Sequence, residues 1–431
     1  MRRSGILLPV FSLPSRHGIG KMGRAAYEFV DFLKGAEVSC WQVLPLSPTG
    51  YGDSPYQSCC TYAGNPYLID FDLLAEEGLL VPADYDGLNW GEDSSTIPYA
   101  LLYTQCYEVL RIAFSNAKPD PDFDAFVEAQ KDWLEDYALY MALKFAHDGK
   151  PFTEWGRSLR RRKKEAMDLA RETYKEDIAF HKFIQYQFFK QWYRLKAYAN
   201  EQGISIIGDL PIYTAADSVE VWAHPELFEL NVLNRPAEVA GCPPDCFSAT
   251  GQLWGNPVYR WKQHRVTGYA WWIHRLGYVS KLFDMVRIDH FRGFESYYSI
   301  PAKKETAEYG AWMPGPGLEL FRAAQQKLGN LILFVDDNKA QIDGYVSQIN
   351  EMESYVDKFK SFHWDAVEIN GHDYNAIHEA ILNAKAVQDK PSAIILHTIK
   401  GKGCTFAERT WCHHISVSKE DMEEALQALQ A

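Results

Sequence analysis

Residues 282–296 read LFDMVRIDHFRGFES, and this stretch decides the predicted fold. An apolar run from Leu282 to Ile288 is followed at once by charged side chains. A short apolar run of this kind predicts a buried parallel strand. In an α/β barrel the C-terminal ends of the strands form the active site, so charges at such an end are candidate catalytic groups. The stretch therefore predicts a barrel strand with a reactive end.

Arg287 and Asp289 are two residues apart, which places both side chains on one face of a strand. A neighbouring guanidinium favours the ionised form of a carboxylate, and an ionised carboxylate suits a nucleophile better than a general acid. An ordinary salt bridge at a strand end explains the spacing equally well. Both interpretations stay open on spacing alone.

Composition excludes some classes of partner. The net charge of -13 and the pI near 5.5 argue against nucleic acid and against an anionic membrane surface. The chain has 13 Trp, 25 Tyr and 23 Phe, and aromatic rings can bind the faces of sugars. Packing in the core is the preferred explanation for them until their positions argue otherwise.

The ends and the cysteines indicate a cytoplasmic protein. Residues 1–18 begin basic, but proline and charged residues interrupt the apolar stretch, so we expect no signal peptide. No apolar run approaches about 18 residues, so we expect no membrane span. The eight cysteines are scattered, and Cys242 and Cys246 lack a second matching pair. We therefore expect reduced thiols and no zinc site.

The order of predicted elements suits an α/β barrel. A strand over Gly5–Phe11, a helix over Ala25–Lys34 and a strand over Val38–Leu46 open the chain. A long loop at 47–67, dense in Gly, Pro, Ser and Tyr, is either functional or a tyrosine-rich structural loop. A further buried strand, Ile204–Leu210, carries Asp209 near its end.

Residues from about 97 to 200 are predicted to be largely helical. Five apolar residues there recur at helical spacing and predict a core stripe, not a binding face: Phe180, Ile184, Phe188, Trp192 and Leu195.

Several motifs carry a family resemblance. VRIDHFRGFESYYSIP, residues 286–301, resembles the nucleophile strand of the 4-α-glucanotransferases, also called amylomaltases or disproportionating enzymes. Three more segments resemble that family: GYGDSPYQS with AGNPYLID, GDLPIYTAADSVEVWAHPELF, and EVAGCPPDCFSATGQLWGNPVYRW. The resemblance covers about residues 4–326. It implies a (β/α)8-type barrel with a helical insertion, and retaining transfer of α-1,4-glucan segments between malto-oligosaccharides or starch- or glycogen-derived glucans, with no cofactor or metal.

The same resemblance implies roles for individual residues. Asp289 would be the nucleophile and Arg287 its charge partner. The substrate-binding residues would be Tyr56 and Asp209 on the donor side, Phe247, Gln252 and Trp254 on a loop over the acceptor side, and His290. Cys246 stands where family members often have Tyr, which should weaken acceptor binding more than the chemistry.

The resemblance stops near residue 326. The family continues with a strand ending in AED-L-G, whose Glu is the general acid/base, and later with a barrel strand that ends in a His-Asp pair. AED-L-G is absent, and none of the strands predicted after residue 326 ends in a His-Asp pair. Residues 327–431 instead resemble part of the thiamine-diphosphate domain of transketolases, with Asn338 matching a Mg²⁺ ligand. The Gly-Asp-Gly metal motif of that domain is absent, so we expect no thiamine diphosphate binding. The predicted fold is therefore an incomplete barrel over 1–326 with an appended α/β segment over 327–431.

Asp336 is the candidate for the missing acid, because it ends the first predicted strand after the junction, in the register of the family's Glu. It can equally be a strand-end acid of the transketolase type. The strands predicted after the junction are Leu331–Val335, which Asp336 follows, Ala366–Ile369 and Ala393–His397. The function alternatives to a glucanotransferase of doubtful activity are a glucan-binding remnant without turnover, a fusion product without function, and a thiamine-dependent transketolase subunit.

Overall fold

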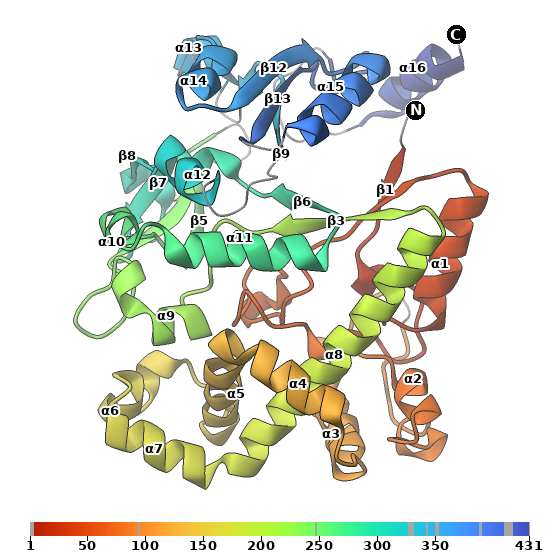
Figure 1. The fold of residues 1–431 in the computed structure, drawn as a ribbon, viewed down its shortest axis with the longest axis vertical. Helices are drawn as coiled ribbons and strands as arrows, with labels where there is room; N and C mark the ends of the chain where they lie inside the picture. The colour runs from red at the N-terminus through yellow and green to blue at the C-terminus, as the bar shows by residue number, and fades with distance from the viewer. Residues whose placement is uncertain are drawn as a thin grey trace.

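The computed structural model of the chain describes residues 4–93, 95–245, 248–325, 332–341, 344–349, 353–387, 390–408 and 417–430. A helical region lies below a central parallel sheet in Figure 1, and a second parallel sheet lies above it. A cluster of buried apolar residues extends from Trp41 in the central sheet to Ile395 in the second one. The two sheets therefore rest on one continuous core.

The central sheet is parallel, with strand order β1-β2-β3-β6. Its strands are β1 (Gly5–Leu7), β2 (Cys40–Gln42), β3 (Ser205–Leu210) and β6 (Met285–Ile288). Helix α1 (Arg24–Gly35) connects β1 to β2, and α11 (Ala270–Leu282) leads into β6. The predicted α/β pattern of strands and helices is confirmed in this sheet.

Three of the predicted strands are shorter than expected, and one of them, predicted over Val38–Leu46, covers only Cys40–Gln42 as β2. Leu282 is the last residue of α11, so β6 begins only at Met285, and its side chains are half-buried or exposed instead of buried. The prediction of a buried strand was wrong because β6 pairs only with β3 among the described residues and lies at a sheet edge. Similarly, β1 ends at Leu7, and Val10–Ser12 form a 3₁₀ turn after Pro9, which cannot donate to a ladder.

The helical region confirms the expected helices between 97 and 200. They are α3 (Tyr99–Ser115), α4 (Pro121–Ala129), α5 (Lys131–Ala146), α6 (Arg157–Arg160), α7 (Lys164–Thr173) and α8 (Lys175–Glu201). The predicted core stripe lies on α8, and all five of its side chains are buried. Earlier in the chain, α2 (Phe71–Glu76) follows the 47–67 loop.

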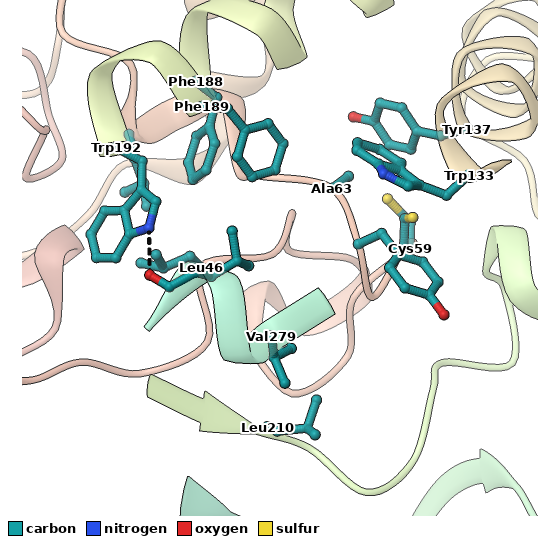
Figure 2. Packing of buried hydrophobic residues seen from close by; sticks show 14 of the residues in the cluster. Leu46, Cys59, Ala63, Trp133, Tyr137, Phe188, Phe189, Trp192, Leu210 and Val279 are labelled. Atoms are coloured by element: carbon teal, nitrogen blue, oxygen red, sulfur yellow. Dashed lines mark hydrogen bonds between the residues drawn. The ribbon is translucent and has the colours of Figure 1, made fainter. Parts of the chain in front are cut away.

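Figure 2 shows how α8 packs against the central sheet. Phe188, Phe189 and Trp192 lie on the side of α8 that faces Leu46 and Leu210. The indole Nε1 of Trp192 donates to the carbonyl oxygen of Leu282 at 3.1 Å, at the end of α11. These side chains border a cavity of about 30 Å³ within the core. This packing holds α8 against the end of β3.

An antiparallel sheet of order β5-β4-β7-β8 stands beside the end of β6. It contains β4 (Glu238–Cys242), β5 (Gln252–Pro257), β7 (Ser296–Pro301) and β8 (Ala311–Pro314). The short helix α9 (Val219–Ala223) precedes β4 in sequence, and the short helix α10 (Trp261–Val266) follows β5. This sheet carries the segments that the family resemblance assigns to the acceptor side.

The second parallel sheet has the order β12-β13-β9 and contains β9 (Ile332–Asp337), β12 (Asp365–Asn370) and β13 (Ser392–His397). The strands predicted there are confirmed, except that Leu331 lies outside the described residues. The remaining elements are α12 (Leu318–Gln325), β10 (Ala340–Gln341), β11 (Gly344–Tyr345), α13 (Val346–Ile349), α14 (Tyr355–Ser361), α15 (Tyr374–Ala386) and α16 (Lys419–Gln430).

The second sheet joins the rest of the molecule through α12. The rings of Phe321 and Trp364 lie 6.4 Å apart, and the Arg322 guanidinium lies 3.9 Å from the centre of the Phe362 ring. No strand pairing joins β6 to β9 within the described ranges, so side-chain packing connects the two sheets there. None of the helices described is both long and apolar enough to cross a membrane.

Candidate active site

A chain of four polar side chains crosses the C-terminal ends of β3 and β6. The Tyr56 hydroxyl donates to Asp209 Oδ2 at 2.6 Å. Arg287 donates from Nη1 to Asp209 Oδ1 at 2.7 Å and from Nη2 to Asp289 Oδ1 at 2.6 Å. The predicted pair of Arg287 and Asp289 is therefore present, and the same guanidinium also binds the acid of the neighbouring strand.

The two carboxylates of this chain differ in exposure. The side chain of Asp209 is fully buried, whereas that of Asp289 is 38% exposed. Burial raises the pKa of Asp209 above its usual value, although the bonds from Tyr56 and Arg287 act in the opposite direction. Burial alone would lower the pKa of Arg287, but the charges of Asp209 and Asp289 outweigh it and raise that pKa. Asp289 is thus the carboxylate that a ligand can reach.

Asp209 is held by protein groups on both of its oxygens, and the phenol of Tyr56 lies against one of them. Its side chain is also fully buried. In the structure as it stands, Asp209 orients Tyr56 and Arg287.

Three rings cluster at His290, the residue that directly follows Asp289. The rings of His290 and Trp254 are perpendicular, with centroids 5.0 Å apart, and Tyr213 lies 6.4 Å and 6.2 Å from them respectively. The indole Nε1 of Trp254 donates to Gln252 Oε1 at 3.0 Å. The predicted residues Gln252, Trp254 and His290 are therefore brought together.

His290 has an unusual backbone and side chain. Its φ of 48° is left-handed, which costs an ordinary residue roughly 1–2 kcal/mol and turns the chain sharply after Asp289. Burial lowers the pKa of His290 to about 4, so the ring is neutral near pH 7. Its Nε2 is buried and has no hydrogen-bond partner among the described residues. A neutral imidazole of this kind can bind a hydroxyl group.

The 47–67 loop is ordered by buried groups from distant elements. Gln185 on α8 exchanges two hydrogen bonds with the backbone of Gly64, at 2.7 and 2.9 Å. Gln191, further along the same helix, likewise exchanges two hydrogen bonds with the backbone of Asp70, at 2.8 and 3.0 Å. Gly64 has to be glycine, because a Cβ there would lie 2.0 Å from the Phe188 ring. The loop that presents Tyr56 is therefore tied to the helical region.

Comparison with known proteins agrees with this geometry. A sequence profile described as 4-alpha-glucanotransferase matches residues 8–380. The chain belongs to the 4-alpha-glucanotransferase family. The family profile extends past residue 326, where the motif resemblance stopped.

Relatives within the 4-alpha-glucanotransferase family are similar over most of this chain. The Clostridium butyricum 4-alpha-glucanotransferase is 46% identical over 331 residues, covering 76% of this chain and 68% of the relative. The enzyme of Thermus thermophilus is 49% identical over 342 residues, covering 78% and 67%. The chain thus spans about two thirds of the length of each relative.

A solved structure gives the same result for the fold. The amylomaltase from Streptococcus agalactiae in complex with acarbose superposes with a TM-score of 0.80 at 36% identity, covering all of this chain and 85% of that one. The chain therefore has the amylomaltase-like α/β fold. These relatives do not support the resemblance of residues 327–431 to transketolase.

Asp336, the candidate acid, lies in the second parallel sheet. It accepts a hydrogen bond from the Thr398 hydroxyl and a long one, 3.5 Å, from Asn338 Nδ2. No hydrogen bond within the described ranges joins it to the chain of four side chains that ends in Asp289. The structure therefore does not bring this residue together with the other candidates by direct contact.

Two predicted residues cannot be placed. Phe247 and Cys246 both lie outside the described residues, between β4 and β5. Tyr213 was missed by the sequence analysis, although it lies within a motif quoted for its resemblance. Its signal was its position four residues after Asp209, just beyond the end of a predicted strand.

Proposed function

We propose that this chain transfers α-1,4-glucan segments between malto-oligosaccharides, with retention, and that Asp289 is the nucleophile. The observation that supports it is the hydrogen-bonded chain from Tyr56 through Asp209 and Arg287 to the exposed carboxylate of Asp289. Arg287 binds Oδ1 of Asp289, and no described group binds Oδ2. That oxygen is free to approach an anomeric carbon.

The reaction proceeds in two displacements. In the first, Asp289 bonds to the anomeric carbon, the glycosidic C–O bond breaks, and the leaving oxygen takes a proton from a general acid. In the second, the hydroxyl of an acceptor glucan loses its proton to the same group and displaces Asp289. Two inversions at one carbon give retention. The reaction needs no cofactor and no metal, since the charge that develops is carried by carboxylates.

For the general acid we propose Asp336. Its carboxyl group would have to come within about 5.5 Å of Asp289, the spacing of a retaining pair. Asp is one methylene shorter than the Glu that the family resemblance implies, so the group falls short by about 1 Å, and such a misplacement can cost about 10²-fold. General acid catalysis as a whole contributes roughly 10²–10⁴-fold. The expected transfer rate is therefore only a trace above background.

The direct test is disproportionation of maltotriose, followed as glucose release. We expect a small but reproducible rate in the wild-type chain, and no rate above background after Asp289→Asn. Asp124→Asn, an exposed change on α4 away from the site, is the control and should leave the rate unchanged. Equal rates in the wild type and Asp289→Asn would exclude Asp289 as the nucleophile.

A second candidate function is glucan binding without turnover. The observation that favours it is that the contacts of Tyr56 with Asp209 and of Trp254 with His290 are both formed while the family's AED-L-G motif is absent. Acarbose, which is bound by the amylomaltase from Streptococcus agalactiae, is a suitable ligand. Binding of acarbose in calorimetry with no glucose release from maltotriose would favour this candidate. A non-cooperative melt without binding would indicate a chain without function.

The finer organisation also belongs to this proposal. We divide the chain into a barrel portion over 1–326, with its helical insertion at about 97–200, and an α/β segment over 327–431. The separation of the two parallel sheets supports an incomplete barrel. We propose no cofactor for the second segment, since the resemblance to transketolase lacks the metal motif, and we propose that the enzyme works in the cytoplasm.

A further inference from the structure

Tyr56 and Gln57 are consecutive, yet they bind two different walls of the candidate site, one on β3 and one on β5. Tyr56 donates to Asp209 at the end of β3, as described above. The amide Nε2 of Gln57 donates to the carbonyl oxygen of Trp254 at 3.0 Å and to Asn256 Oδ1 at 2.8 Å, both on β5. One dipeptide thus connects the wall that contains Asp209 to the wall that contains Trp254.

Asn256 is the fixed partner in this contact. It is buried, and its Nδ2 donates to the carbonyl oxygen of Thr214 at 2.8 Å. That bond fixes which way the amide points, so Oδ1 of Asn256 faces Gln57 and needs a donor from it. A longer contact of 3.4 Å runs from Asn256 Nδ2 back to Gln57 Oε1.

The backbone of Gln57 is held in place independently of these bonds. Its N–H donates to the carbonyl oxygen of Ser54 at 3.1 Å, and the next residue, Ser58, pairs with Thr49 across the loop. A Cβ on Gly50 would lie 2.5 Å from the carbonyl oxygen of Gln57, so the loop closes here only with glycine. The Gln57 side chain therefore projects from a rigid base.

The bond to Trp254 matters because of what Trp254 touches. Its ring packs edge-on against His290, which directly follows Asp289. The backbone of Trp254 lies on β5, whose neighbour in the sheet is β4, and the segment between β5 and β4 includes residues outside the described ranges. The hydrogen bond from Gln57 to the Trp254 carbonyl oxygen therefore ties this wall to the loop that carries Tyr56.

We infer that Gln57 is a positioning residue, which keeps the Trp254–His290 wall at a set distance from the Tyr56–Asp209 wall and thereby sets how tightly a glucan chain is held between them. This inference rests on the proposed function, because it assumes that a glucan lies between the walls. Gln57 acts through Trp254 and needs no contact with the sugar itself. Its effect should therefore disappear when the Trp254 side chain is absent.

The test measures maltoheptaose binding by isothermal titration calorimetry in the Asp289→Asn background, where turnover does not interfere. Gln57→Glu keeps the shape of the side chain but places an acceptor oxygen against two other oxygens. Since losing such bonds costs about 1–3 kcal/mol, we expect the dissociation constant to rise on the order of tenfold. With Trp254→Ala already present, the same change should raise it by less than about twofold, because the two residues act as a unit.

Matched variants separate positioning from a general loss of structure. Gln105→Glu is the control, because Gln105 also donates its Nε2 to a backbone carbonyl oxygen, that of Asn89 at 2.7 Å, on α3 and outside the site. It should leave affinity unchanged. Gln57→Asn, which is neutral but too short to reach β5, decides the matter if the melting temperature shows that Gln57→Glu is unfolded.

Each outcome has a defined meaning. Absence of maltoheptaose binding by the Asp289→Asn protein would overturn the proposed function and this inference with it. Binding that is unchanged by Gln57→Glu and Gln57→Asn would overturn the inference alone. Effects of Gln57 and Trp254 that add in full would also overturn it, since they would show that Gln57 does not act through Trp254.

Discussion

The central sheet and the second parallel sheet both end in acidic side chains, but different groups surround them. In the central sheet, Asp209 is buried beneath the phenol of Tyr56, which belongs to a loop outside the sheet. In the second, Asp337 is equally buried, and His397 from the next strand binds it at 2.9 Å while Glu368 binds the other side of that ring at 3.1 Å.

The difference shows what turns a strand end into a site. Buried parallel strands gain polar groups where they leave the sheet, so acids at strand ends follow from architecture alone. Within the part of the chain that the structure describes, a long loop and an antiparallel sheet add polar and aromatic side chains at the end of the central sheet. In the second sheet the described polar contacts of Asp337 come from its own sheet and from Lys339, two residues later.

The largest expected effect tests whether the two sheets share one site. Asp336→Glu restores the missing methylene, and if Asp336 reaches toward Asp289 we expect glucose release from maltotriose to rise by about 10²-fold. Asp337→Glu, a change of the same size at the buried neighbour, should give no gain. No change after Asp336→Glu would show that Asp336 does not act as the acid.

The next prediction concerns the unpaired strand edges of the two parallel sheets, which are not joined by strand pairing in the described residues. Unpaired strand edges expose backbone donors and acceptors that pair with other chains, so we expect the protein to oligomerise or aggregate in size-exclusion chromatography. Phe334 on β9 is 42% exposed, and Phe334→Lys should shift the protein toward monomer. Val232→Lys, a change at a residue that is 79% exposed and lies outside any described strand, should not. A monomeric wild-type peak with a sharp melt would contradict the prediction.

A smaller effect distinguishes the histidines of the two regions. Burial lowers the pKa of His181 to about 3 and those of His17 and His264 to about 4, whereas His397 in the second sheet is 39% exposed. A histidine whose pKa is lower in the folded protein than in the unfolded chain contributes its full stabilisation at pH values above the unfolded-state pKa, about 6.5. That stabilisation is lost as the pH falls from about 6.5 toward the folded-state pKa. For His181 alone, the free energy of unfolding should fall by about 2 kcal/mol when the pH is lowered from 7.5 to 5.

Urea unfolding at those two pH values measures the loss. His181→Phe removes the titrating group from a site already lined by aromatic rings, so the difference between the two pH values should shrink by about 2 kcal/mol. His224→Asn, at a half-exposed ring, serves as the control. The same pH difference in His181→Phe and wild type would refute the assignment.

The last prediction is that thiamine diphosphate does not bind to this protein. Calorimetry with Mg²⁺ and thiamine diphosphate should show no binding, because the Gly-Asp-Gly motif that supplies a metal carboxylate is absent from the sequence. A micromolar dissociation constant would show that the strand ends of the second sheet do form a ligand site, and would remove the contrast between the two regions.

Local patterns predicted most of the elements and part of the site. The pair of Arg287 and Asp289 could be predicted because two-residue spacing places side chains on one face of a strand. The bond from Arg287 to Asp209 could not, since those residues are 78 positions apart and meet only through the pairing of β3 with β6. The half-burial of β6 likewise depends on a neighbouring strand, which no local pattern specifies.

The contact between Gln57 and Asn256 shows the same limit more strongly. It spans 199 positions, and neither amide belongs to a residue type that indicates catalysis. The family motifs included both residues, but they gave neither of them a role. Only the direction of the two amides in space shows that they face each other.

The glutamine bonds that hold the 47–67 loop also bear on the order in which the protein folds. Gln185 and Gln191 each lie 121 positions after the backbone groups they bind. Contacts between such distant residues form slowly, because the entropy of a long intervening segment must be lost first. During synthesis the loop leaves the ribosome long before α8 does. The segment that carries Tyr56 therefore cannot be tied to the helical region until α8 has been synthesised, so the candidate site is completed only after that helix.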